Sequence, residues 1–77
     1  MTSVQISLNS IDKVKAFVNS IAAFKSDFDL VSGRYVIDAK SIMGIFSLDL
    51  SKPITLNIQS EEDIDEILAK LEPFIVK

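Results

Sequence analysis

The 77-residue chain contains no cysteine, no histidine and no tryptophan. Without cysteine it can form neither a disulfide bond nor a thiolate metal site, and nothing indicates an oxidising compartment. Without histidine it lacks the side chain that most often acts as general base near neutral pH. The first ten residues do not resemble a signal peptide, and no apolar run approaches the ~20 residues of a membrane-spanning helix. A cytoplasmic protein is therefore expected.

The charge distribution also argues against several classes of partner. The net charge of −3 does not suit nucleic acid, and five of the eleven acidic residues lie together in residues 61–66. This acidic run suits the first turn of a helix, where the helix dipole favours negative charge. We therefore expect a protein partner, with no nucleic acid, membrane, cofactor or metal bound.

The hydrophobic pattern predicts one domain, residues 1–77, small enough to bury only about 60% of its unfolded surface. Alternating and helical spacings predict, in order, a strand at 4–8, a helix at 11–25, a hairpin at 27–39, a short helix beginning near Ser41, a strand at 54–59 and a final helix. Asn9 or Ser10 can cap the first helix, and Ser60 with Asp63 matches a capping box for the last. Pro73 is expected to end or kink that last helix.

The element order β-α-β-β-α-β-α predicts an α+β fold. Four strands in so short a chain suggest a single sheet, with the longer helices packed on one of its faces. This arrangement is an open-faced β-sandwich.

The segment from residue 42 to 50 contains six large apolar residues in nine positions. A helix of one or two turns cannot turn all of them inward. Some of Ile42, Met43, Ile45 and Phe46 are therefore expected to form an exposed apolar patch, and such patches often mark interfaces. The alternative is that all four belong to the core of a small domain.

Residues 40–48, KSIMGIFSL, resemble the run before and within the short second helix of the HPr family, the small phosphocarriers of the bacterial sugar phosphotransferase system. The element order agrees over essentially the full length. The resemblance implies an HPr-like fold with a four-stranded, mainly antiparallel sheet. It also implies that Ser41 matches a serine phosphorylated by an ATP-dependent kinase, after which the family member binds a transcriptional regulator.

The phosphocarrier site of the family is missing. Counting back from Ser41 without a gap, residues 8–13 (LNSIDK) stand where the family has Gly-apolar-His-Ala-Arg-Pro, so Ser10 replaces the histidine. The family histidine carries its phosphate as a phosphoramidate, which passes the phosphate on. A phosphoester on serine would instead keep it. Asp12, where the family has arginine, would repel a phosphate by about 1 kcal/mol in water. Relay of phosphate from phosphoenolpyruvate to sugars is therefore not expected, and no residue is assigned a catalytic role.

The resulting hypothesis is a histidine-less HPr-like regulatory or interaction protein that is not an enzyme. Ser41 is its candidate phosphosite, and a helix cap is the structural alternative for that residue. Lys40, Ile42, Met43 and Phe46 are the candidate docking residues, while Lys40 and Arg34 could also pair with a phosphate or attract an acidic partner. Two alternatives remain: a docking module that ignores phosphate, and an accessory subunit of a larger transport or metabolic enzyme.

Overall fold

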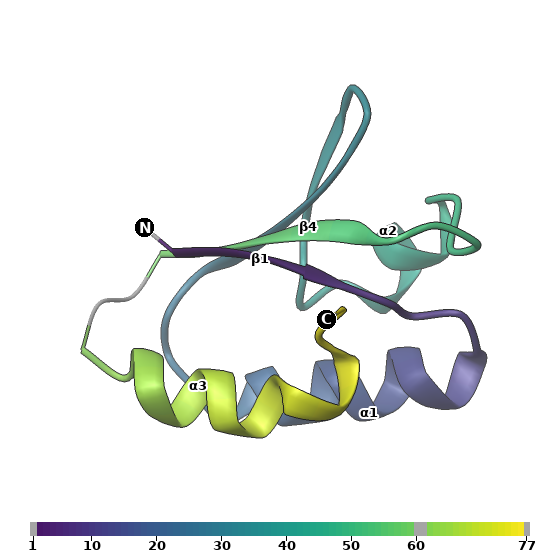
Figure 1. Cartoon of the computed structure of the whole chain (residues 1–77). Coiled ribbons are helices and arrows are strands. Elements are labelled where there is room, and N and C mark those ends of the chain that lie inside the picture. Colours follow the sequence, from purple (N-terminus) through teal and green to yellow (C-terminus); the bar gives the residue numbers. More distant parts are fainter. Residues whose placement is uncertain (1, 60–61, 77) are drawn as a thin grey trace.

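The elements of the chain follow the predicted order (Figure 1). The computed structural model describes residues 2–59 and 62–76. The strands are β1 (Thr2–Ile6), β2 (Phe28–Ser32), β3 (Tyr35–Asp38) and β4 (Ile54–Ile58). The helices are α1 (Ile11–Ala22), α2 (Ile42–Phe46) and α3 (Ile64–Leu71), and a 3₁₀ turn (Glu72–Phe74) follows α3.

The strands form one sheet in the order β1-β4-β2-β3, in which every pairing is antiparallel. Leu56 of the central strand β4 pairs with Val4 on one side and with Leu30 on the other. This register places alternate apolar residues of neighbouring strands on the same face. The predicted antiparallel, open-faced sheet is confirmed.

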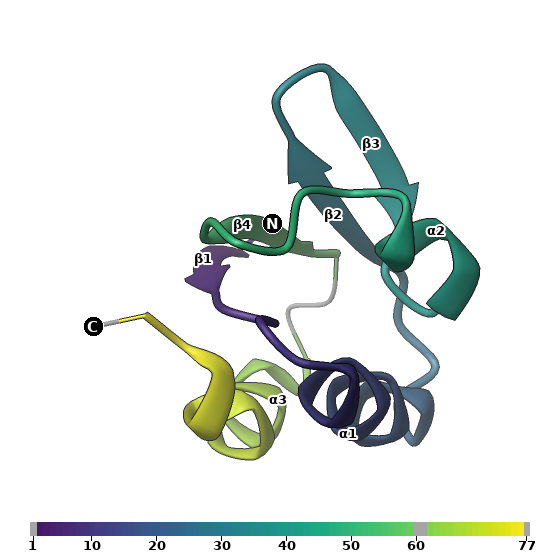
Figure 2. The same ribbon diagram turned by 90° about the vertical axis from the view of Figure 1, so that its right-hand side faces the viewer.

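The core lies between this face and two of the helices. Figure 2 shows α1 and α3 side by side below the sheet, with α2 apart from them next to β3. Phe17 of α1 and Phe74 after α3 meet edge to face, with ring centroids 5.8 Å apart. The fully buried residues come from all these layers, among them Ile6, Phe17, Ile21, Phe28, Leu30, Leu56, Ile67 and Leu71. No helix in the described ranges is long and apolar enough to cross a membrane.

Two predicted boundaries were wrong by two or three residues. Helix α1 ends at Ala22 rather than residue 25, because the amide of Phe24 bonds to the carbonyl of Ile21 and tightens the last turn. Strand β1 occupies 2–6 rather than 4–8. Beyond it, the amide of Ser7 donates to Phe74 O at 2.8 Å, so the chain there follows the C-terminal segment instead of β4.

The last helix begins later than the capping-box pattern predicted. Asp63 itself occupies the cap position directly before Ile64, whereas Ser60 lies outside the described residues. The prediction for Pro73 is confirmed, because α3 stops at Leu71 and continues only as the 3₁₀ turn that contains the proline.

Candidate functional site at the short helix

Ser41 is the N-cap of α2. Its backbone is extended (φ −96°, ψ 104°), and its Oγ accepts a hydrogen bond from the amide of Gly44 at 3.2 Å. Its carbonyl accepts from the amide of Ile45, and its own amide donates to the carbonyl of Asp38, both at 3.0 Å. These bonds hold the serine between the end of β3 and the first turn of α2, as the cap interpretation predicted.

Gly44 leaves room for the hydroxyl of Ser41. A Cβ at this position would lie 3.2 Å from Ser41 Oγ and 3.3 Å from Ile37 Cδ1, both tighter than ordinary van der Waals contact. Any larger residue would therefore press on the half-buried serine. The sequence interpretation gave Gly44 no role, although its position three residues after the serine is the one that faces a cap side chain.

Helix α2 has one buried side and one exposed side. Ile45 is completely buried, and it is the only α2 residue in the core. Met43 is 82% exposed, with Phe46 at 41% and Ile42 at 37%. The prediction that some of these residues form an exposed patch is confirmed, and the alternative that all belong to the core is wrong. Five residues cannot present four large side chains to one layer.

The exposed side of α2 continues to the beginning of α1. An open hollow of about 530 Å³ lies between them, lined by Ser10, Ile11, Phe46 and Leu50 together with Asn9 and Ser51. Ile11 is 60% exposed, although it recurs at helical spacing with Val14, Phe17 and Ile21, which are buried. It is the first residue of the helix and lies beside α2 rather than under the sheet. We call Ile11, Ile42, Met43 and Phe46 the apolar surface.

Ser10, predicted to stand where the family has its histidine, is an exposed N-cap of α1. Its Oγ accepts a hydrogen bond from the amide of Lys13 at 3.1 Å. Asp12 lies in the first turn of the same helix. Within the described residues no hydrogen bond joins the Ser10 hydroxyl to the carboxylate of Asp12, so no base is placed to activate it as a nucleophile.

The ammonium of Lys40 is held at the end of α1 and the beginning of β2. Its Nζ donates to the carbonyl of Phe24 at 2.8 Å and lies 5.6 Å from the ring centroid of Phe28. These contacts join the loop before α2 to the end of α1, so they give the half-buried lysine a structural task. Arg34, the other cation singled out in the sequence, lines a separate hollow at the β2–β3 turn.

The comparisons with known proteins identify the sequence family and the fold. The family model described as the PTS HPr component phosphorylation site matches residues 12–77, a range that begins two residues after Ser10. The fold is similar to HPr-C-His from Thermoanaerobacter tengcongensis, with a TM-score of 0.77 and 26% identity over 95% of this chain and 89% of that one. No curated protein matches the sequence.

Two other solved structures are similar over nearly the whole chain. The phosphocarrier protein HPr from Bacillus anthracis str. Ames has a TM-score of 0.71 and 28% identity over 97% of this chain and 94% of that one. Crh, the catabolite repression protein of Bacillus subtilis, has a TM-score of 0.64 and 29% identity over 96% and 90%.

Proposed function

The chain belongs to the HPr family, and from this premise we propose that it is a histidine-less regulatory member that docks a protein partner through the apolar surface and is switched by phosphorylation of Ser41. The observation that carries the proposal is a cap serine, Ser41, directly beside exposed Met43 and Phe46. We further propose that residues 1–77 act as one domain in the cytoplasm, without catalytic activity of their own.

The loss of the phosphocarrier reaction follows from side-chain chemistry. The chain has no histidine, so no phosphoramidate can form on an imidazole. Ser10 could hold a phosphate only as an ester, next to the negative charge of Asp12 in the same helical turn. A serine hydroxyl beside a carboxylate does not readily accept a phosphate, and the stable phosphoester that it forms does not pass the phosphate on.

A phosphate on Ser41 would meet different surroundings. The first turn of α2 contains no acidic residue, and its backbone amides point toward the cap. The phosphate would add nearly two negative charges at neutral pH at the edge of an otherwise uncharged surface. A partner with an apolar centre and a neighbouring arginine or lysine would then bind the modified form more tightly, because the new charge pair adds to the apolar contact.

Intact mass after two incubations tests the switch. One sample receives ATP and a bacterial HPr kinase, and the other receives phosphoenolpyruvate and the first enzyme of the phosphotransferase system. We expect one added phosphate with ATP, its loss in Ser41→Ala and its retention in Ser10→Ala. A phosphate acquired from phosphoenolpyruvate would refute the argument from the missing histidine, and an unmodified protein in both samples would refute the switch.

A phosphate-independent docking module is the second candidate, because the apolar surface is already exposed in the unmodified chain. In this case the apolar surface holds the partner without a phosphate on Ser41, as it would in an accessory subunit of a transport or metabolic enzyme. Affinity capture with the unmodified chain and with the chain phosphorylated on Ser41, each beside its Met43→Ala variant, separates the candidates. A kinase and a transcriptional regulator among the captured proteins support the switch, whereas a single metabolic enzyme supports the accessory subunit.

A further inference from the structure

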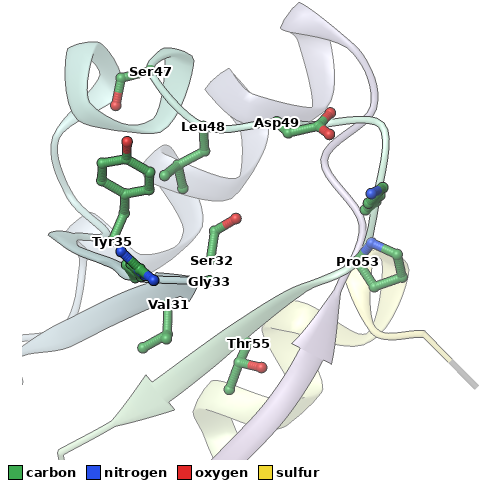
Figure 3. Close-up of a pocket in the computed structure, with 11 residues that line it drawn as sticks. Val31, Ser32, Gly33, Tyr35, Ser47, Leu48, Asp49, Pro53 and Thr55 are labelled. Atoms are coloured by element: carbon green, nitrogen blue, oxygen red, sulfur yellow. The ribbon is translucent and has the colours of Figure 1, made fainter.

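A second hollow lies on the other side of α2, between the β2–β3 turn and the segment that leads into β4. Its volume is about 470 Å³, within the usual range for small-molecule sites. Figure 3 shows the side chains of Ser32, Tyr35 and Leu48 reaching into the same space from the hairpin and from the segment after α2. None of the four residues of the apolar surface lines it, so it is a separate feature of the molecule.

Two cations, Arg34 and Lys52, line this hollow. Arg34 follows Gly33, whose positive φ of 60° makes the turn, and Lys52 precedes Pro53. Both side chains are exposed, and within residues 2–59 and 62–76 neither has a carboxylate at ion-pair distance. A guanidinium and an ammonium on one concave surface suit an anion with several oxygens, because the guanidinium can donate two parallel hydrogen bonds to it.

The remaining polar groups suit hydroxyls rather than a second anion. Ser32, Tyr35 and Ser47 contribute hydroxyl groups, and the hydroxyl of Ser47 already donates to the carbonyl of Gly44, so its lone pairs are left to accept. Asp49 adds a carboxylate. The side-chain hydrogen bond from Ser51 holds the pKa of Asp49 below its ordinary value, with the amide of Ser51 and the charge of Lys52 acting in the same direction.

We propose that this hollow binds a sugar phosphate, with the phosphate held by Arg34 and Lys52 and the sugar hydroxyls bonded to Asp49 and Ser32. The ring of Tyr35 and the side chain of Leu48 supply the apolar surface that a sugar ring requires. Asp49 favours a ligand that brings hydroxyls together with its phosphate, since a carboxylate accepts hydrogen bonds from sugar hydroxyls. Both halves of the ligand are therefore needed for binding.

An amide NMR titration of the isotope-labelled chain tests the proposal with three probes: glucose 6-phosphate, glucose and inorganic phosphate. We expect the amides of Gly33, Arg34 and Lys52 to shift with glucose 6-phosphate at low millimolar concentration, and much less with either other probe. Equal shifts with inorganic phosphate would overturn the assignment to a sugar phosphate. The absence of shifts at these amides would overturn the site.

Matched variants locate the two halves of the ligand. Arg34→Gln removes an exposed charge at the turn and should weaken glucose 6-phosphate binding about tenfold. Lys15→Gln removes an exposed charge on α1, outside the hollow, and should leave it unchanged. Asp49→Asn should weaken glucose 6-phosphate and strengthen inorganic phosphate, so that the two affinities converge. An unchanged affinity in Arg34→Gln, or a preference that survives Asp49→Asn, would contradict the proposed contacts.

Discussion

Two helices of this chain begin with the same two residues, serine and isoleucine. Ser10 caps α1 by accepting from the third residue of the helix at 3.1 Å, and Ser41 caps α2 in the same way at 3.2 Å. In both helices the isoleucine that follows, Ile11 or Ile42, is exposed. The cap therefore gives no reason to assign different functions to the two serines.

The next two positions distinguish them. Helix α1 continues with Asp12 and Lys13, which are charged, whereas α2 continues with Met43 and Gly44, which are not. The carboxylate of Asp12 suits a helix dipole and opposes a phosphate on the cap. With Met43 at the corresponding position, α2 lacks this small stabilisation by a carboxylate, and the large apolar side chain of Met43 is 82% exposed. The comparison teaches that the residues after a cap, rather than the cap itself, separate a structural serine from a candidate switch.

The two helices also differ in how many residues anchor them to the core. Removing the one anchor of α2 should have the largest effect on stability. Helix α1 buries Val14, Phe17 and Ile21, whereas α2 buries only Ile45. We expect Ile45→Ala to lower the free energy of unfolding by about 3 kcal/mol, because it removes the one core contact of α2 and leaves a cavity. Met43→Ala, on the opposite side of the same helix, should change it by less than about 0.5 kcal/mol.

Urea unfolding of the two alanine variants measures this difference. Equal losses in Ile45→Ala and Met43→Ala would mean that Met43 is packed in solution, and the exposed side of α2 would then not be free for a partner.

Removing the two caps should have a smaller effect. Ser10→Ala and Ser41→Ala each lose one side-chain hydrogen bond to a helix amide, worth about 1 kcal/mol. Because α2 has five residues and a single buried anchor, its amides should exchange with solvent faster in Ser41→Ala. Those of α1 should remain protected in Ser10→Ala beyond the first turn. Hydrogen exchange followed by NMR measures the amide protection of each helix in its cap variant. Equal losses of protection in α1 and α2 would show that the two helices depend on their caps to the same extent.

Gly44 and Lys13 occupy the same position after their caps, so alanine at each gives a matched pair. Gly44→Ala gains up to about 1 kcal/mol of helix propensity and loses part of it to crowding against Ser41 Oγ and Ile37. The net change in unfolding free energy should therefore be smaller than that of either cap variant. Phosphorylation of Ser41 by the kinase should nevertheless become several-fold slower, whereas Lys13→Ala should leave it unchanged. An unchanged phosphorylation rate in Gly44→Ala would show that the kinase does not need the space beside Ser41.

How much the sequence could predict depends on the range of the interactions involved. The element order, both serine caps and the stop at Pro73 rest on local patterns, and all were predicted. The exposure of Ile11 does not follow from its spacing, because helical spacing gives a face without saying what lies against it, and here α2 lies beside the first turn. The contact between Lys40 and the carbonyl of Phe24 joins residues 16 positions apart, so no local pattern contains it. The same limit applies to the hollow between Arg34 and Lys52, which two separate segments create.

The smallest expected change in stability belongs to the variant that most directly interchanges the two helix starts. Met43→Asp makes α2 begin Ser-Ile-Asp, as α1 does, and should raise the free energy of unfolding by about 0.3 kcal/mol through the helix dipole. It also places a carboxylate beside the phosphate of modified Ser41 and a charge within the apolar surface, so partner binding should weaken by about 2 kcal/mol.

Asp12→Met in α1 is the control, which should cost a little stability and leave partner binding intact. Calorimetric titration of both variants with the captured partner, beside their urea curves, would separate stability from function. If Met43→Asp bound the partner as tightly as the unaltered chain, the two serine-capped helix starts would be equivalent, and the docking surface would have to lie elsewhere.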